Sequence, residues 1–194
     1  MTNRIIFATN NADKMKEIKM ILNDLEFEVV SLSEAGISVD IKETGSTFEE
    51  NAMIKARTIM EMTHEIVLAD DSGLEIDALD KAPGIYSARF LGEKTSYDYK
   101  NNYILDKLKD VPEVNRTARF VCAIACAFPD GRCITKRGTI EGRIGYQIAG
   151  SNGFGYDPIF YLPEYQCTTA ELTPEQKNKI SHRAKALHAM KEEL

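Results

Sequence analysis

Three short apolar runs, separated by patterns typical of helices, occupy the first 70 residues and limit the folds open to this chain. RIIFA (4–8), FEVVSL (27–32) and EIVLA (65–69) each have the length and composition of a strand. Apolar residues recur at helical spacing from about residue 12 and again from about residue 46. Because strands that alternate with helices form βαβ units, this order predicts an α/β protein.

The second half of the chain predicts antiparallel pairing. Residues 117–128 and 132–140 are two strand-like runs joined by PDG at 129–131, a sequence typical of hairpin turns. Two helices are predicted near the C-terminus, one starting at Thr173 and one after Ser181. The expected fold is therefore α/β, with a mixed sheet flanked by helices.

Length and charge narrow the classes of function. With 194 residues, 43% of them hydrophobic, the chain can bury the core of a single domain, which we expect to span residues 1–194. The net charge of −6 argues against general binding of nucleic acid, which normally requires a basic face. The opening MTNRIIFATNN has too short an apolar stretch for a secretory signal or a membrane span, so we expect a cytoplasmic protein without membrane partners.

The four cysteines lack the spacing of a metal site. Cys122 and Cys126 fall in the apolar run FVCAIACAF, and Cys133 and Cys167 have no Cys-x-x-Cys partner. Since structural zinc sites need closely spaced ligands, buried reduced thiols are the favoured interpretation.

A short polar loop follows the first predicted strand, in ATNNADKMKE. Thr9, Asn10 and Asn11 precede a helix start, where free backbone N–H groups and the helix dipole favour an anion. Lys14 follows one turn inside the helix. These residues suit phosphate oxygens, but the loop lacks the glycines of a Walker motif. Taken alone, an asparagine N-cap with a solvated lysine is the simpler interpretation.

Two adjacent aspartates end the third apolar run, in VLADDSG. Neighbouring side chains on a strand point in opposite directions, so Asp70 and Asp71 are expected to differ in role: one braces a turn and the other faces a cleft. A carboxylate in a cleft needs a cation, and Mg²⁺ would supply that charge, bound by one or two carboxylates and substrate phosphates. Glu43 is available as a second acidic ligand, and Lys55 lies near the apolar stripe of its helix. A plain turn between strands is the alternative.

A glycine-rich segment, GSNGFGYDPIF, spans residues 150–160. It combines glycines with Phe154, Tyr156 and Asp157, which suits an aromatic platform beside a hydrogen-bonding carboxylate. An ordinary turn that packs on the core is the alternative.

A basic segment, KNKISHRAKAL, brings Lys177, His182 and Arg183 near a helix start. An arginine offers donors and no acceptor, so Arg183 could bond the 6-oxo group of a purine but could not accept from a 6-amino group. A basic surface helix would have the same sequence pattern.

Six motifs occur in one order along nearly the whole chain: T-N-N-x-x-K-x-x-E, TGSTFEENAMIKAR, ADDSGLEIDAL, PGIYSARF, GSNGFGYDPIF and ISHRAKAL. Together they closely resemble the inosine triphosphate pyrophosphatase family, also called XTP/dITP diphosphatases. The resemblance runs from about residue 5 to residue 190. A series of six motifs in order is far more specific than any one of them.

The resemblance implies a Mg²⁺-dependent enzyme that hydrolyses non-standard purine nucleoside triphosphates (ITP, dITP and XTP) to the monophosphate and pyrophosphate. By the same likeness, the fold would be an elongated mixed sheet with helices, forming two lobes around a central cleft. A homodimer is the expected assembly.

The resemblance also assigns roles to the residues that match the motifs. Glu43 and Asp71 would bind Mg²⁺, and Asp71 would be the base for the attacking water. No role follows for PGIYSARF. The substrate-binding residues would be Thr9, Asn10, Asn11, Ala12, Asp13 and Lys14 at the triphosphate, Lys55 and Ser72 at the phosphates, Phe154, Gly155, Tyr156 and Asp157 at the nucleoside, and Lys177, His182 and Arg183 at the base and phosphate.

Two other functions compete with this one. A Maf-like pyrophosphatase would act on pyrimidine or modified nucleotides, although the SHR and FGYDP sequences count against it. A non-catalytic nucleotide sensor would keep the pocket without turnover. The presence of both Glu43 and Asp71 disfavours a sensor, because a binding protein has no need of a carboxylate that activates water.

Overall fold

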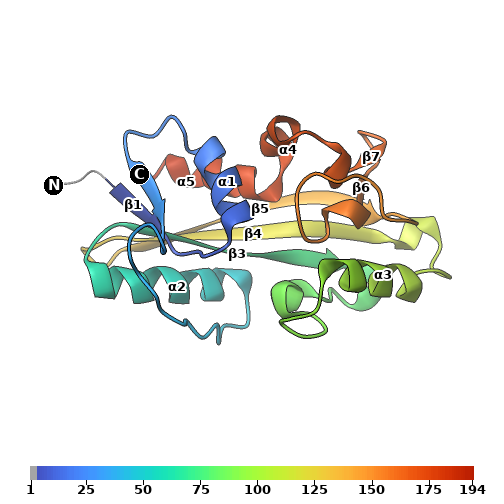
Figure 1. Ribbon diagram of the computed structural model, residues 1–194, viewed down its shortest axis with the longest axis horizontal. Helices are drawn as coiled ribbons and strands as arrows, with labels where there is room; N and C mark the ends of the chain where they lie inside the picture. Colours follow the sequence, from blue (N-terminus) through green and yellow to red (C-terminus); the bar gives the residue numbers. More distant parts are fainter. Residues whose placement is uncertain (1–3) are drawn as a thin grey trace. The chain divides into compact units, whose positions relative to one another are not determined.

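The computed structural model describes residues 4–194 of the chain. Within this range the strands form one seven-stranded sheet in the order β2-β1-β3-β4-β5-β6-β7 (Figure 1). The strands are β1 (Arg4–Phe7), β2 (Glu28–Ser31), β3 (Val67–Ile76), β4 (Thr117–Ala127), β5 (Cys133–Ile144), β6 (Phe160–Leu162) and β7 (Cys167–Thr168). The helices are α1 (Ala12–Ile21), α2 (Phe48–Thr63), α3 (Tyr97–Lys107), α4 (Pro174–Ile180) and α5 (His182–Lys191).

The sheet is mixed, as predicted. β1 pairs in parallel with both β2 and β3, and β6 pairs antiparallel with β5 and β7. β4 and β5 are neighbours joined by a tight turn, in which Phe128 N–H donates to the carbonyl of Arg132 at 2.9 Å. The sequence prediction of an α/β fold with a mixed sheet flanked by helices is confirmed.

The chain divides into two compact units. The first unit comprises, within the described residues, 4–71, Cys122–Gly138 and His182–Leu194. The second unit comprises Ser72–Val121 and Thr139–Ser181. β3, β4 and β5 each contribute residues to both units. The expectation of one domain with two lobes over residues 1–194 stays a prediction.

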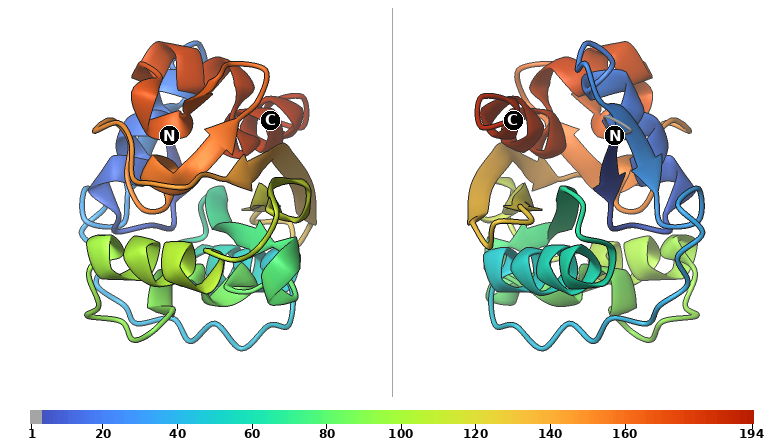
Figure 2. Two further views of the ribbon diagram at one scale, coloured as in Figure 1. Left: turned by 90° about the vertical axis from the view of Figure 1, so that its right-hand side faces the viewer. Right: turned by 90° about the vertical axis from the view of Figure 1, so that its left-hand side faces the viewer.

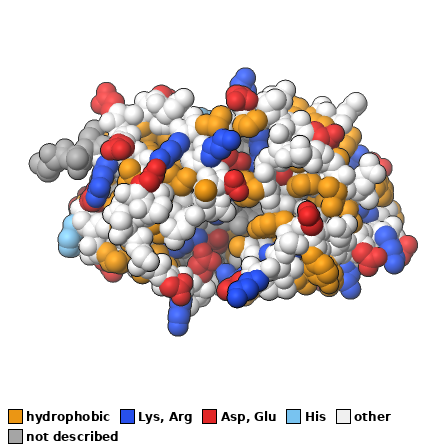
Figure 3. Space-filling model, viewed as in Figure 1, with side chains coloured by type: hydrophobic (Ala, Val, Ile, Leu, Met, Phe, Trp, Pro, Cys, Tyr) orange, Lys and Arg blue, Asp and Glu red, His pale blue; other side chains and the backbone are white. Residues whose placement is uncertain are grey.

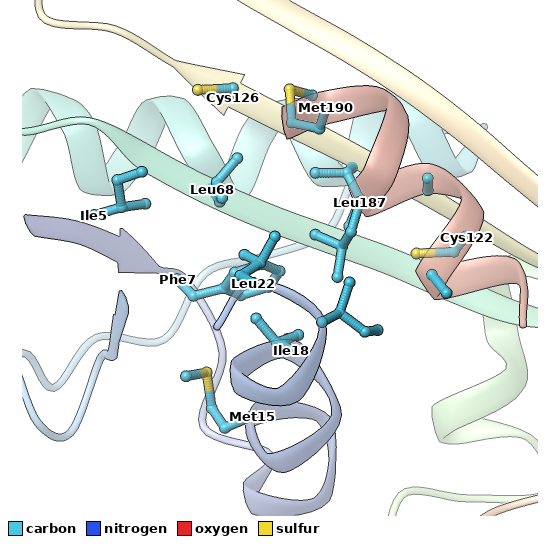
Figure 4. Packing of buried hydrophobic residues seen from close by; sticks show 14 of the residues in the cluster. Ile5, Phe7, Met15, Ile18, Leu22, Leu68, Cys122, Cys126, Leu187 and Met190 are labelled. Carbon is cyan, nitrogen blue, oxygen red and sulfur yellow. The ribbon is translucent and has the colours of Figure 1, made fainter. Parts of the chain in front are cut away.

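The first unit packs helices on both faces of its strands. α1 and α5 lie together on one face, and α2 lies on the opposite face (Figures 1 and 2). Apolar side chains from β1, β3, α1 and α5, among them Phe7, Leu68, Ile18 and Leu187, meet in one buried cluster (Figure 4). Burying this surface provides the main free energy that holds the helices to the sheet.

Ser46 has the capping-box spacing to Glu49, but it is not the N-cap of α2, which begins at Phe48. Thr47 is the N-cap, and its Oγ1 accepts a hydrogen bond from the backbone N–H of Glu50 at 3.1 Å. Ser46 instead donates through its backbone N–H, at 2.6 Å, to the Glu50 carboxylate. The sequence STFEEN contains both Ser46-x-x-Glu49 and Thr47-x-x-Glu50, so the spacing alone did not distinguish the two caps.

The second unit has its own core and its own helices. α3 and α4 lie on opposite sides of its strands (Figure 2). Its apolar cluster includes Leu74, Ile104, Phe120, Ile144 and Phe160, all at most 7% exposed. The helix α4 starts as predicted, because Thr173 and Gln176 form a reciprocal capping box and Pro174 occupies the first turn.

The cysteines are all free thiols, as expected from their spacing. Cys122 and Cys126 on β4 are buried in the first unit, whereas Cys133 and Cys167 are half-buried. Burial raises the pKa of both Cys122 and Cys126 to about 12. The prediction of buried reduced thiols is therefore confirmed for Cys122 and Cys126.

The surface carries charges of both signs. On the face shown in Figure 3, Lys and Arg side chains alternate with Asp and Glu side chains, so no large patch of one sign covers this face. Among the helices of residues 4–194, none is long and apolar enough to cross a bilayer.

Candidate active site

Asp70 and Asp71 lie inside β3, which continues to Ile76. The predicted strand end at residue 69, and the alternative of a turn at the aspartates, are therefore wrong. Both residues are buried: Asp70 is 1% exposed and Asp71 is 7% exposed. A buried carboxylate is tolerated only where cations or hydrogen-bond donors face it, so the partners of these two residues allow the strand to continue.

Asp70 is held by two cations. Its Oδ2 lies 2.8 Å from Lys14 Nζ at the start of α1, and 3.5 Å from Arg183 Nη2 at the start of α5. Burial alone would raise the pKa of Asp70, but the charges of Lys14 and Arg183 outweigh it and keep the pKa well below its usual value. Asp70 is thus ionised, and it positions the ammonium group of Lys14.

Asp71 has different partners, and two of them come from α2. Its Oδ2 accepts a hydrogen bond from Asn51 Nδ2 at 3.1 Å, and its Oδ1 lies 3.9 Å from Lys55 Nζ. Burial is the main cause that raises the pKa of Asp71 to about 6, with a further rise from the charge of Glu43, against the opposing effect of Lys55. Adjacent carboxylates whose pKa values move in opposite directions are a common arrangement at catalytic sites.

Lys55 lies between two carboxylates. Its Nζ is 2.6 Å from Glu43 Oε1, in addition to its contact with Asp71. Burial alone would lower the pKa of the Lys55 amine, but Asp70, Asp71 and Glu43 together raise it. Lys55 therefore stays charged while largely buried, which agrees with its predicted place near the apolar stripe of the helix.

Glu43 and Asp71 fit a divalent cation. Both carboxylates lie within 3.9 Å of the Lys55 ammonium group, and both offer the hard oxygen ligands that Mg²⁺ prefers. Residues 4–194 contain no cluster of three or more acidic, histidine or cysteine side chains arranged around a common point. Two carboxylates are nevertheless the usual protein share at a Mg²⁺ site, since waters and substrate phosphates complete the coordination.

The loop before α1 is largely exposed. Asn10, Asn11, Ala12 and Asp13 are exposed, and Thr9 is half-buried. Asn11 is the N-cap, because its Oδ1 accepts from the backbone N–H of Lys14 at 3.0 Å. The simpler interpretation of Asn11 as a cap is thus confirmed, whereas Lys14 is paired with Asp70 and is not a solvated lysine.

Arg183 is buried, with 2% of the residue exposed. Besides its contact with Asp70, its Nη1 donates to Glu17 Oε2 on α1. Burial alone would lower the pKa of Arg183, but Glu17 and Asp70 raise it. His182, one residue earlier, is also buried, and its backbone lies so close to Gly138 that a Cβ there would come within 2.2 Å of the His182 carbonyl oxygen. This close contact fixes the start of α5, and with it the position of Arg183.

The second unit contains a separate network around Asp157. Its Oδ2 accepts from Lys177 Nζ at 2.6 Å and from the backbone N–H of Phe154 at 2.8 Å, and its Oδ1 accepts from Thr169 Oγ1 at 2.8 Å. Lys177 Nζ also lies 5.1 Å from the centroid of the Phe154 ring. Gly153 has φ +71, and a Cβ there would lie 2.2 Å from Asp157 Oδ2, so this position requires glycine. Asp157 thus determines the conformation of the loop.

The rest of the loop is held by aromatic and amide contacts. Tyr156 is buried, its hydroxyl donates to the carbonyl of Ser87 at 2.8 Å, and its ring meets Tyr97 edge-on at 5.2 Å. Asn101 Nδ2 donates to the carbonyl of Gly155 at 3.0 Å. Phe154 is half-buried. Phe154 therefore keeps part of its surface accessible on a loop that is otherwise fixed.

The structure gathers most of the predicted residues into two clusters, one in each unit. Ser72 is half-buried on β3 in the second unit, directly after Asp71. The functional roles assigned to all these residues stay predictions. The charged cluster of the first unit comprises Lys14, Glu17, Glu43, Asn51, Lys55, Asp70, Asp71 and Arg183; the loop cluster of the second unit comprises Phe154, Gly155, Tyr156, Asp157 and Lys177.

Two members of the charged cluster had no predicted role. Asn51 precedes Lys55 by four residues, and Glu17 follows Lys14 by three, so both pairs share a helix face. Helical spacing from a known lysine could have identified both. In the second unit, Asn101 stands on α3 and lies 54 residues from Gly155 in the sequence, so no local spacing could have indicated its contact.

Residues 5–193 of the chain match the sequence model of the Ham1 family. A dITP/XTP pyrophosphatase of Exiguobacterium sibiricum is 50% identical over 191 residues, which cover 98% of this chain and 96% of that protein. The dITP/XTP pyrophosphatase of Clostridium perfringens is 46% identical over 197 residues, covering 98% of this chain and 97% of that protein.

Solved structures show the same fold. The Ham1 protein of Staphylococcus aureus superposes with a TM-score of 0.87 at 43% identity, covering 97% of this chain and 96% of that one. A HAM1 protein of Coxiella burnetii gives a TM-score of 0.87 at 42% identity, covering 96% of this chain and 95% of that one. The similarity thus extends over nearly the whole chain in sequence and in structure.

Proposed function

The chain belongs to the Ham1 family, and on that premise we propose that it is a pyrophosphatase that hydrolyses dITP, XTP and ITP to the nucleoside monophosphate and pyrophosphate with Mg²⁺. Relatives about half identical to this chain carry the name dITP/XTP pyrophosphatase. The identification of the chain as a nucleoside triphosphate pyrophosphatase agrees with the resemblance seen in its six motifs. Action on ITP and dependence on Mg²⁺ are the further parts of the proposal.

The observation that carries the proposal is the position of Asp71. It is a buried carboxylate with a pKa of about 6, beside Lys55 and Glu43. A general base works best when its pKa lies near the working pH, and an exposed aspartate titrates about two units lower. Asp71 is therefore the group in the charged cluster best suited to accept a proton near neutral pH.

In the proposed reaction a water molecule attacks the α-phosphorus of the nucleotide. Asp71 takes the proton of this water as the new phosphorus–oxygen bond forms. The bond between the α-phosphorus and the oxygen that bridges to the β-phosphorus then breaks, and pyrophosphate leaves with that oxygen. A correctly placed general base contributes about 10²- to 10⁴-fold to such a step.

Lysines stabilise the charge that develops on the phosphates. Asp70 holds Lys14 at the N-terminus of α1, where the helix dipole also favours an anion. Glu43 and Asp71 hold Lys55 in the same way. Mg²⁺ bound by Glu43 and Asp71 would neutralise phosphate charge and orient the water. Thr9 to Asp13, and Ser72, are proposed to contact the phosphates.

The loop cluster is proposed to bind the nucleoside. Phe154 offers an accessible aromatic ring, and Gly155, Tyr156 and Asp157 belong to a loop whose conformation is fixed before substrate arrives. A preformed loop lowers the entropy cost of binding. Lys177 and His182 are proposed to contribute at the base and phosphate.

Arg183 is proposed to recognise the 6-oxo group of the base, and its position offers a direct test. Its contacts with Glu17 and Asp70 also link it to Lys14 on the phosphate side. For Arg183→Ala we expect loss of discrimination between ITP and ATP, because selective sites depend on hydrogen bonds to the correct base. Equal loss of activity on both nucleotides would show instead that Arg183 acts through Asp70 and Lys14.

We further propose a cytoplasmic homodimer that acts on small nucleotides, without nucleic acid or membrane partners. The net charge of −6 and the mixed surface charge argue against a nucleic-acid partner. Light scattering coupled to gel filtration would measure the assembly, and a monomer at all concentrations would contradict the expected dimer.

The function is tested by pyrophosphate release from purified protein with Mg²⁺ and equal concentrations of ITP, XTP, GTP, ATP and dTTP. We expect a strong preference for ITP and XTP. Activity on dTTP alone would indicate a Maf-like enzyme, and nucleotide binding without release of pyrophosphate would indicate a sensor.

A further inference from the structure

We propose that Asn51 is a positioning residue. It holds Asp71 and the loop that carries Glu43 at the separation that a divalent cation needs to bind both carboxylates. The inference rests on the proposed function, because it concerns the same metal site. It assigns a role to a neutral side chain that is neither a proposed metal ligand nor a proposed substrate contact.

Both polar atoms of the Asn51 side chain are engaged, and they join different segments. Nδ2 donates to Asp71 Oδ2 on β3 at 3.1 Å, and Oδ1 accepts from the backbone N–H of Gly45 at 2.8 Å. The residue is 0% exposed. Because a buried amide with both bonds made has little freedom to rotate, it sets the separation between β3 and the loop before α2.

Gly45 shows how closely the loop lies against this amide. A Cβ at Gly45 would be 2.7 Å from Asn51 Oδ1 and 2.7 Å from the Cβ of Glu50. No side chain can be accommodated there without displacement of the loop or of Asn51. Gly45 is two residues from Glu43, so the contact with Asn51 fixes the chain immediately beside that carboxylate.

Lys55 provides the second bridge from the same helix face. It lies four residues after Asn51 on α2, and its Nζ contacts Glu43 at 2.6 Å and Asp71 at 3.9 Å. Asn51 and Lys55 thus each connect the loop to β3, one through neutral hydrogen bonds and the other through charge. A cation that binds Glu43 and Asp71 competes with the charge of Lys55, but it does not compete with the neutral bonds of Asn51.

Side chains that orient metal ligands from behind typically change metal affinity or activity 10- to 100-fold when they are removed. The test is therefore a titration with Mn²⁺, followed by electron paramagnetic resonance, without nucleotide. We expect the dissociation constant of Asn51→Leu for Mn²⁺ to rise about tenfold, since leucine keeps a similar volume and removes both bonds. A folded Asn51→Leu protein whose Mn²⁺ affinity lies within about twofold of the unmodified chain would overturn the inference.

The matched control is Asn101→Leu in the second unit. Asn101 is also a helical asparagine, 2% exposed, and it donates a single bond to the carbonyl of Gly155. The same substitution there removes a buried amide without touching Glu43 or Asp71. We expect its Mn²⁺ affinity, measured without nucleotide, to stay within about twofold of that of the unmodified chain, and an equal loss in this control would contradict a specific role of Asn51.

A second variant keeps the inference testable if Asn51→Leu fails to fold, as judged by circular dichroism. Gly45→Ala retains the asparagine at position 51 but displaces its amide through the new methyl group. We expect Mn²⁺ binding to weaken at least about threefold. A folded Gly45→Ala protein with unchanged Mn²⁺ affinity would overturn the inference in that case.

Kinetics at saturating Mn²⁺ separate positioning from substrate binding. For Asn51→Leu we expect kcat to fall about tenfold while KM for the nucleotide changes less than about threefold, because the proposed phosphate and nucleoside contacts are intact. An unmodified chain that binds Mn²⁺ in an Asn51-dependent way but releases no pyrophosphate would refute the proposed function and support the positioning role. An unmodified chain that binds no Mn²⁺ would overturn the positioning role.

Discussion

Both compact units bury an aspartate beside a lysine, but the two pairs differ in geometry. In the second unit, Asp157 Oδ2 lies 2.6 Å from Lys177 Nζ, and the carboxylate also accepts from Phe154 and Thr169. In the first unit, Asp71 lies 3.9 Å from Lys55 Nζ, and burial raises its pKa to about 6.

The difference separates a carboxylate that supports the fold from one that is available for chemistry. Asp157 is ordered by short contacts that complete a loop, so its charge contributes to a fixed conformation. Asp71 retains a strong tendency to gain a proton or a cation, at a cost in stability to the chain alone. Four predictions test this contrast.

The largest expected effect concerns activity. Asp71→Asn removes the proposed base and one proposed metal ligand, so we expect turnover to fall about 10³-fold while the chain stays folded. Pyrophosphate release at saturating nucleotide, with circular dichroism as the folding check, measures this effect. Asp106→Asn, at a side chain that is 73% exposed on α3, is the matched control. Turnover of Asp71→Asn within tenfold of the unmodified chain would show that Asp71 is not the group that carries out the chemistry.

The next effect concerns the stability of the second unit. Asp157→Asn leaves Lys177 buried, with 6% of its side chain exposed, beside a neutral partner. Breaking a buried pair from one side typically costs about 3 kcal/mol or more of unfolding free energy. Urea unfolding at pH 7 measures it, with Asp106→Asn expected to stay within about 0.5 kcal/mol of the unmodified chain. A loss below about 1 kcal/mol would show that the short contacts of Asp157 add little.

The third effect concerns Asp71 in metal-free protein, where, in contrast to Asp157, we expect the charged carboxylate to lower the unfolding free energy. Its folded pKa of about 6 lies above the ordinary value of 3.8, so the folded state binds the proton more tightly. The stability from this group is therefore complete below about pH 4 and is lost as the pH rises through about 6, by about 3 kcal/mol.

Asp71→Asn removes this pH dependence. With EDTA present, we expect the variant to match the unmodified chain in unfolding free energy near pH 4 and to exceed it by about 3 kcal/mol at pH 8. Urea unfolding at the two pH values provides the comparison. A variant less stable than the unmodified chain at pH 8 would show that Asp71, like Asp157, stabilises the fold.

The smallest effect concerns a single neutral bond of the loop cluster. Tyr156→Phe removes the hydroxyl that donates to the carbonyl of Ser87, and we expect a loss of about 1 kcal/mol in unfolding free energy. Tyr99→Phe, at a residue that is 61% exposed, is the control without effect. A loss at Tyr156 equal to that of the control would show that the loop is held mainly by Asp157.

Local pattern predicted most of the fold. The apolar runs at 4–8 and 27–32 correspond to β1 and β2, and the PDG turn joins β4 to β5 as expected. The end of β3 was misplaced because two aspartates ordinarily favour a turn. Their partners Lys14, Arg183, Asn51 and Lys55 come from distant segments, so the tertiary contacts that keep the strand intact had no local signal.

The sequence predicted which residues belong to the candidate site, but it did not predict which of them contact one another. Motif resemblance identified Lys14, Lys55 and Asp71, and the structure places all three in the charged cluster. The burial of Arg183 between Glu17 and Asp70 did not follow from the sequence, because a basic residue near a helix start is usually exposed. Long-range pairing between residues such as 17 and 183 depends on how α1 and α5 pack.

The rate at which the buried thiols of β4 are modified can measure how often the first unit opens. Cys122 is fully buried, and its pKa of about 12 leaves almost no thiolate at neutral pH. A thiol reagent can therefore modify Cys122 only during moments when the surrounding strands and helices separate. The rate of its modification would report how often the core around Cys122 opens, and a bound nucleotide that stabilises this unit would slow that rate.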